Sequence, residues 1–190
     1  MAETIAKVLY PEDNHPEGKS LRLKQQYFFV SATVQSIVRK HRAEYGTLRN
    51  FHLKHVIQIN DTHPTMVIPE LIRLLVERGL DIDEAIDVVS RTCAYTNHTI
   101  LVEALEKWPI GYLKKVVPQL VPIIEILDDK VRRRFSDEST AIIDRNDTVH
   151  MAHIDIHYGF SVNGVAALHT DILKPVSYTH LRAHETLMNL

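Results

Sequence analysis

Apolar residues recur at steps of three and four in four stretches of the chain, a spacing typical of amphipathic helices. The four stretches run from about 20 to 42, from 67 to a stop at Gly79, from a cap at Asp81 through Cys93, and from 113 to 127. Two prolines in the last stretch predict one long helix that is bent there. Turn-forming residues dominate positions 10 to 20, which predicts a loop ahead of the first helix.

Two shorter runs predict strands. Residues 55 to 59 are rich in β-branched side chains, and residues 150 to 157 alternate apolar positions with histidines. A further helix is expected around 162 to 173. Each strand leads into a helix, so the pattern predicts an α/β, mostly helical fold with an incomplete doubly wound core. Ligands of such folds bind at the carboxyl ends of the strands, which makes 60–64 and 158–165 the first candidate segments.

Composition narrows the function classes. The 190 residues carry a formal net charge of -2 and one cysteine, Cys93. Near-balanced charge argues against a nucleic-acid partner held by bulk charge, and one cysteine excludes an internal disulfide. The start of the chain does not resemble a signal peptide, and no apolar run reaches the ~18 residues of a membrane span. We therefore expect a soluble cytoplasmic protein with no membrane partner.

The loop after the first predicted strand places Asp61 and His63 two residues apart, where both side chains can converge on a polar ligand such as a sugar. The alternative is an Asx or capping arrangement, in which Asp61 or Thr62 caps a helix beginning near Pro64, with proline in the first turn. The pattern alone favours neither interpretation.

His98 lies in the polar run Thr96–Thr99, which the pattern places between two helices. A lone loop histidine is more often structural than functional. Its polar neighbours can nevertheless bind a sugar hydroxyl as readily as they bind the backbone.

Two further patterns have ordinary explanations. On a strand, His153, Asp155 and His157 would project three metal-ligand types from one face, but this spacing arises easily by chance in a chain with 12 histidines. Asn163 and Gly164 would open a helix suited to an oxygen-rich ligand, and they are equally typical of a routine strand-to-helix turn. We expect no metal site.

Six segments, in collinear order between about Lys7 and Lys174, resemble the α-glucan (glycogen, starch and maltodextrin) phosphorylases closely. They are EGKSLRLKQQYF at 17–28, IQINDTHP at 57–64, RTCAYTNHT at 91–99, EALEKWP at 103–109, MAH at 151–153 and SVNGVA at 161–166.

The resemblance implies an internal fragment of the N-terminal, Rossmann-like domain of a two-domain, GT-B-type glycosyltransferase. Family members phosphorolyse α-1,4-glucans to glucose 1-phosphate with retention, and their full-length chains form homodimers. Their pyridoxal 5′-phosphate is held by the C-terminal half, so the fragment is expected to supply the sugar-binding side of the active site and to be inactive alone. The alternative from a different class is a non-catalytic carbohydrate-binding or helical interaction domain.

Matching residue by residue, the resemblance implies one catalytic position, a gate and four sugar contacts. They are His98 as the catalytic residue, Asp13 in the loop that gates the site, and Asn14, Asp61, His63 and Val165 as substrate-binding residues. The His98 side chain is expected to bind the glucose 6-hydroxyl while its main-chain carbonyl faces the developing oxocarbenium ion. No position matches a cofactor-binding residue.

Some positions depart from the animal enzymes. Phe160 replaces a histidine, as in bacterial members, and Val102 replaces a proline beside the pocket. A bacterial source is therefore expected. The segment between Arg39 and Lys54 is shorter than in the animal enzymes, which argues against a nucleotide-responsive site there.

The last 16 residues do not continue the alternation of strands and helices. Ser177 to Thr186 resembles translated adapter sequence, so we expect 1–174 to be the phosphorylase segment and 175–190 to be a non-native tail.

Overall fold

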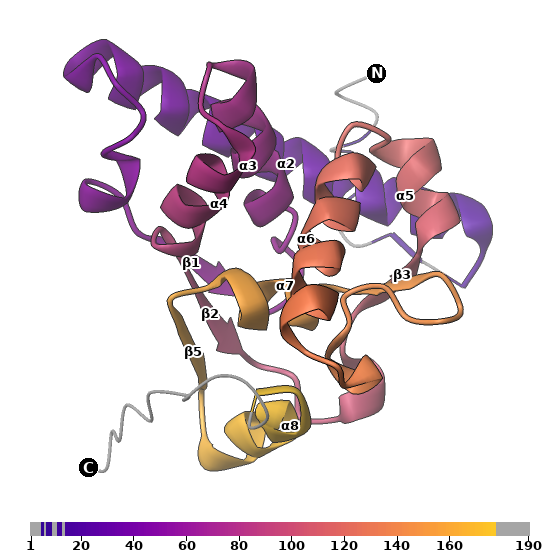
Figure 1. Cartoon of the computed structure of the whole chain (residues 1–190). Helices are drawn as coiled ribbons and strands as arrows, with labels where there is room; N and C mark the ends of the chain where they lie inside the picture. Colours follow the sequence, from indigo (N-terminus) through magenta and orange to yellow (C-terminus); the bar gives the residue numbers. More distant parts are fainter. Residues whose placement is uncertain (1–4, 6, 9–10, 13, 178–190) are drawn as a thin grey trace.

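The computed structural model describes residues 5, 7–8, 11–12 and 14–177 of the chain (Figure 1). Its fold is α/β and mostly helical, as the sequence predicts. In chain order the elements are α2 (Pro16–Tyr45), η1 (Phe51–Leu53), β1 (Ile57–Asn60), α3 (Val67–Glu77), α4 (Ile82–Ser90), β2 (Cys93–Asn97), η2 (Val102–Ala104), β3 (Lys107–Pro109), α5 (Ile110–Val116), α6 (Val121–Arg134), η3 (Glu138–Thr140), β4 (Thr148–His150), α7 (Met151–Tyr158), β5 (Ser161–Gly164) and α8 (Ala167–Ser177).

A three-stranded parallel sheet organises the chain, in the order β1-β2-β5. The register pairs Asn60 of β1 with Thr96 of β2, and Thr96 with Asn163 of β5. All three strands therefore end at one edge, where three polypeptide segments far apart in sequence meet. A separate antiparallel pair joins β3 to β4.

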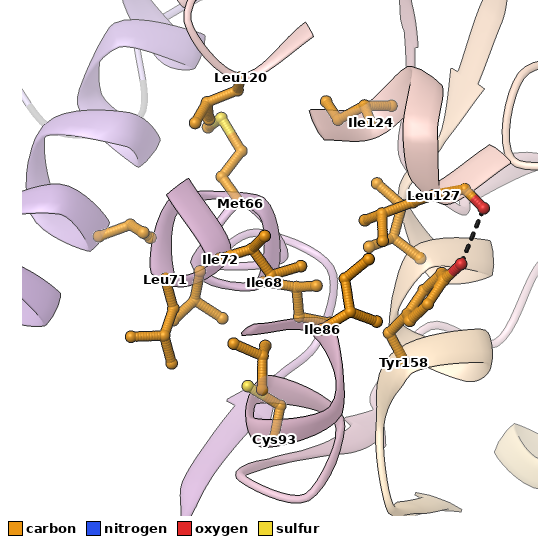
Figure 2. Close-up of a cluster of buried hydrophobic side chains, with 14 of the residues drawn as sticks. Met66, Ile68, Leu71, Ile72, Ile86, Cys93, Leu120, Ile124, Leu127 and Tyr158 are labelled. Atoms are coloured by element: carbon orange, nitrogen blue, oxygen red, sulfur yellow. Dashed lines mark hydrogen bonds between the residues drawn. The ribbon is translucent and has the colours of Figure 1, made fainter. Parts of the chain in front are cut away.

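The core lies around α3, which packs against α2, α4, α6 and α7 (Figure 1). Figure 2 shows Met66, Ile68 and Ile72 of this region facing Ile86 of α4 and Leu120 and Ile124 at α6. Tyr158 enters the same core, and its hydroxyl donates to the Leu127 carbonyl at 2.8 Å. A buried tyrosine usually needs such a partner, so this bond ties α7 to α6.

The end of α2 and the start of α4 follow the sequence signals. Gly46 adopts a left-handed conformation (φ 70°) and donates its N–H to the Arg42 carbonyl, which ends α2. The Asp81 side chain caps α4 by accepting from the Asp83 N–H, as predicted. The predicted loop over 10–20 is wrong in its second half. α2 begins at Pro16 because His15 caps it, accepting from the Gly18 N–H at 3.0 Å, and proline is compatible with the first turn.

The central strand β2 was missed. The pattern carries a helix through Cys93, whereas α4 ends at Ser90 and Cys93 begins β2. Ile86, Val89 and Cys93 keep helical spacing across this boundary, so apolar periodicity does not reveal the stop. The Thr92 hydroxyl donates to the Val88 carbonyl and closes the helix end. Consequently Thr96 and Asn97 lie within a strand, and His98 and Thr99 follow that strand rather than a helix.

The predicted strand over 150–157 is also wrong. β4 ends at His150, and residues 151–158 form α7, in which all but His157 are buried. A helix buried on nearly every side has no one-sided apolar stripe, so its sequence mimics the alternation of a strand. The next prediction fails with it, since Asn163 and Gly164 lie inside β5 and the helix starts later, at Ala167.

The single bent helix expected over 113–127 is two helices, α5 and α6. Pro118 lacks an N–H and disfavours continuation of a helix, whereas Pro122 lies in the first turn of α6, where proline is tolerated. Among the described residues, no helix combines the length and apolar character that crossing a membrane requires. Residues 175–177 complete α8 and 178–190 lie outside the described residues, so the boundary at 174 stays a prediction.

Gly164 tests the packing of β5 on α8. A Cβ added there would lie 2.5 Å from the Thr170 nitrogen and 2.6 Å from the His169 Cβ. We expect Gly164→Ala to lower the free energy of unfolding by about 1–3 kcal/mol, measured by urea denaturation. Gly111→Ala is the matched control, because nothing lies within 4 Å of its added Cβ in α5. Equal stabilities of the two variants would contradict the close approach of β5 and α8.

Candidate functional site

Asp61 joins the ends of β1 and β2. It adopts φ 60°, a left-handed conformation that aspartate tolerates, and its N–H donates to the Thr96 carbonyl at 2.8 Å. Its carboxylate accepts from the Thr62 N–H at 3.0 Å and from the Thr99 hydroxyl at 3.1 and 3.2 Å. Asp61 therefore closes its own turn and the next loop, and α3 begins after Met66 without a side-chain cap. The capping alternative is wrong.

His63 faces a buried carboxylate. Its Nδ1 lies 3.4 Å from Glu106 Oε2, and the Thr62 hydroxyl lies at the same distance from that oxygen. Glu106 Oε1 accepts from Gln26 Nε2 and Trp108 Nε1, both at 2.8 Å. These contacts connect α2, the loop after β1 and the start of β3 through one carboxylate.

The contact between His63 and Glu106 shifts the pKa of each group in the direction that favours its charged form. The hydrogen bond to Glu106 raises the pKa of His63 against the opposing effect of burial, and the charge of Asp61 adds to the rise. Burial alone would raise the pKa of Glu106, but the hydrogen bonds from His63, Gln26 and Trp108 outweigh it and the pKa is lowered. Both shifts favour the imidazolium form of His63 and the carboxylate form of Glu106.

His98 is presented by a rigid turn at the end of β2. Its side chain is exposed, whereas the preceding Asn97 is fully buried. Asn97 Oδ1 accepts from the Thr99 N–H at 3.1 Å, and its Nδ2 donates at 2.9 Å to the carbonyls of Thr99 and His169. The backbone around His98 is thereby fixed independently of its ring.

Val165 follows β5 at the same sheet edge. Its N–H donates to the Asn97 carbonyl at 3.2 Å, and its side chain is 52% exposed. The sheet edge thus gathers Asp61, His63, His98 and Val165 from three segments, which sequence spacing alone does not reveal.

A pocket of about 380 Å³ lies beside His63. One side of the pocket is formed by α2, through Arg22, Gln26 and Phe29. The other side is formed by β1 and the loop after it, through Asn60, His63 and Pro64. Planar polar groups beside an exposed aromatic ring suit a sugar, which offers hydroxyls at its edge and C–H groups on its faces.

Asn14 stands apart from this assembly. It lies ahead of α2, and its side-chain amide donates to Glu12 at 2.9 Å. Within the described residues, no hydrogen bond joins Asn14 to Asp61, His63 or His98. Asp13 lies outside the described residues, so its expected gating role stays a prediction.

The three metal-ligand candidates lie on α7, and each forms a hydrogen bond with a different residue outside that helix. His153 Nδ1 donates to the Ala141 carbonyl at 2.6 Å and His157 Nε2 to the Thr140 carbonyl at 2.8 Å. Burial lowers the pKa of His153 to about 4, which keeps the ring neutral. No group of three ligand-type side chains in the described part of the chain could hold a metal ion.

Asp155 on α7 is bound to the loop after β1 through Thr65. It is fully buried, and its Oδ2 accepts from the Thr65 hydroxyl at 2.5 Å. Oδ1 has no hydrogen-bond partner among the described residues. Burial raises the pKa of Asp155 well above its usual range, and the charges of Glu106 and Asp61 raise it further.

Sequence reasoning did not predict the contacts that Glu106, Thr99, Asn97 and Asp155 make in the structure. Each acts through a partner distant in sequence, so spacing gives no signal. A glutamate two residues before the only tryptophan is a signal that could have been used, because a buried indole N–H needs an acceptor.

Comparison with known proteins decides the family. The family model described as carbohydrate phosphorylase matches residues 1–187. The chain belongs to the carbohydrate phosphorylase family. It is 56% identical over 174 residues to maltodextrin phosphorylase of Streptococcus pneumoniae, covering 92% of this chain and 23% of that protein.

Other phosphorylases align over the same region. Glycogen phosphorylase of Bacillus subtilis is 44% identical, covering 90% of this chain, and the human muscle form is 43% identical, covering 92%. The chain spans 23% of the length of each of these relatives. It is therefore a phosphorylase segment whose candidate site lies at the carboxyl edge of its parallel sheet.

The raised pKa of Asp155 predicts that the stability of the folded chain depends on pH. Its pKa is higher in the folded than in the unfolded chain, so the folded state keeps a proton that the unfolded state loses above about pH 4. Stability from this group is present below that pH and declines as the pH rises, by up to ~1.4 kcal/mol per unit. Asp155→Asn keeps an acceptor for Thr65 and removes the titration, so its stability relative to wild type should increase between pH 4.5 and 7.

Urea denaturation at several pH values measures this difference. Asp129→Asn, at an exposed position of α6, is the matched control. A stability difference for Asp155→Asn that stays constant across the range would contradict a buried neutral carboxyl.

Proposed function

We propose that this segment supplies the sugar-binding side of the active site in an α-glucan phosphorylase. The complete enzyme would transfer glucosyl units from the ends of α-1,4-glucans to phosphate, giving glucose 1-phosphate with retained configuration. The single observation that carries the proposal is the meeting of the loops after β1, β2 and β5 at one polar edge, in a chain of this family. A Rossmann-like domain of a two-domain GT-B architecture is the corresponding fold proposal.

In this proposal each residue of the candidate site has its own role in binding the sugar or stabilising the transition state. Asp61 and His63 bind sugar hydroxyls, and Val165 contacts an apolar face of the ring. The His98 ring binds the 6-hydroxyl, and its main-chain carbonyl faces the positive charge that develops at the anomeric carbon. A fixed carbonyl dipole favours that charge over the neutral ground state and so lowers the barrier. Asn14 reaches the sugar and Asp13 gates it when the remainder of the enzyme is present.

The cofactor proposal rests on what this segment lacks. Among the described lysines whose exposure is defined, none is buried, and the half-buried Lys130 pairs with Asp83 on the helical side of the molecule. These residues do not fit a Schiff-base site for pyridoxal 5′-phosphate. We propose that residues outside this chain hold the cofactor, that the full-length enzyme is a homodimer, and that it acts in the cytoplasm of a bacterium.

The partition of the site predicts the behaviour of the isolated segment. We expect the purified 190-residue chain to release no glucose 1-phosphate from maltodextrin and phosphate, even with pyridoxal 5′-phosphate added. A coupled assay for glucose 1-phosphate measures this. Detectable product would show that the chemistry does not need the rest of the enzyme.

His98 is tested in the full-length enzyme. His98→Ala should lower kcat/KM by the value of about one hydrogen bond, ~0.5–1.5 kcal/mol plus the cost of an unpaired hydroxyl. Asn97 fixes the backbone, so the main-chain carbonyl should survive the substitution and activity should fall without vanishing.

A 6-deoxy substrate completes a double cycle that isolates the contact. The loss caused by His98→Ala should shrink for that substrate, because it cannot make the bond. Equal losses with both substrates would assign His98 to holding the loop rather than the sugar.

A further inference from the structure

Glu106 is a largely buried carboxylate surrounded by hydrogen-bond donors, not an exposed surface charge. It lies between η2 and β3, and its side chain is 9% exposed. Its backbone carbonyl accepts from the Met151 N–H at 3.1 Å, which fixes the main chain against the start of α7. Burying a carboxylate is costly unless several donors surround it, and here four side chains do so.

The two carboxylate oxygens have different partners. Oε1 accepts two short hydrogen bonds from neutral donors on α2 and β3, Gln26 and Trp108. Oε2 faces the loop after β1, where Thr62 and His63 approach at 3.4 Å. The first pair holds the carboxylate in place, which leaves the second oxygen to orient the loop.

This contact decides how the imidazole is presented. A ring nitrogen beside a carboxylate must carry its proton, so Nδ1 of His63 is an N–H donor directed at the protein. His63 also lines the pocket together with Arg22 and Asn60, and its side chain is 45% exposed. Nε2 is the ring nitrogen that Glu106 does not contact, so it is the nitrogen available to a ligand in this pocket.

We infer that Glu106 is a positioning residue for the sugar site: its carboxylate orients His63 through Nδ1 and favours the protonated ring, so that Nε2–H donates to a sugar oxygen in the pocket. The ligand in this inference rests on the proposed function, whereas the link between Glu106 and His63 does not. Three charged groups act on the ring, namely Glu106 before β3, Asp61 in the same loop and Arg22 on α2. The first two stabilise the cation and Arg22 opposes it.

The first experiment titrates His63 in the 190-residue chain by NMR of its ring resonances. Glu106→Gln keeps the shape of the side chain and an acceptor for Gln26 and Trp108, and it removes the charge. The midpoint for His63 should fall to lower pH by more than the spread between wild type and Glu125→Gln. The latter is a matched control on an exposed position of α6.

The reciprocal variant guards against misfolding of Glu106→Gln. His63→Leu changes a half-exposed residue and should raise the midpoint of the Glu106 carboxyl resonance, because a hydrogen bond that lowers it is lost. Unchanged midpoints in both variants would overturn the inference. A shift in either variant, absent from the control, supports it.

The second experiment measures kcat/KM against pH in the full-length enzyme. If a cationic His63 binds the glucan, Glu106→Gln should lower kcat/KM by roughly 2- to 10-fold near neutral pH, the range of one hydrogen bond. It should also move the alkaline limb to lower pH, whereas a purely structural residue would scale the whole profile. An unmoved limb would overturn the role of Glu106 in sugar binding. Absence of phosphorolysis in the wild-type enzyme would refute the proposed function and leave the titration result standing.

Discussion

Parallel pairing of β1, β2 and β5 is the constraint on which the site depends. Parallel strands all end at the same edge, so residues 60–66, 97–101 and 164–166 meet although the first and last segments lie about 100 positions apart. The helices α3 and α4 make the crossover between β1 and β2, and their packing fixes the distance between the first two loops. The chemistry proposed for the edge therefore follows from a register set by the apolar core (Figure 2).

Buried carboxyl groups then refine the arrangement in two different ways. Glu106 stays ionised because Gln26, Trp108 and His63 donate to it, and it contributes a charge to the site. Asp155 has one side-chain donor, Thr65, and burial raises its pKa well above the usual range, which favours the neutral form. The first group tunes a neighbouring imidazole, and the second holds the loop at some cost in stability at neutral pH. The two carboxyl groups differ in role because more hydrogen-bond donors surround Glu106 than surround Asp155.

The sequence was sufficient for the fold class, the glycine stop of α2, the Asp81 cap of α4, the strand β1 and the family, because each leaves a local signal. It was insufficient for β2, since helical spacing continues through Cys93, and for α7, since a helix buried all round looks like an alternating strand. The spacing left open whether Asp61 and His63 converge on a ligand, and the structure places both at the same sheet edge. Their fixing partners, Thr99 and Glu106, lie about 40 positions away, beyond the reach of spacing arguments.

The central claim is that the loops after β1 and β2 are locked together before any sugar binds. A double-mutant cycle on the free energy of unfolding tests it with Asp61→Gly and Thr99→Val. Glycine is chosen because φ 60° would strain alanine. The account expects a coupling of about 0.5–1.5 kcal/mol between the two positions, the value of a hydrogen bond. Effects that add to within ~0.3 kcal/mol would contradict it, because the two loops would then be independent.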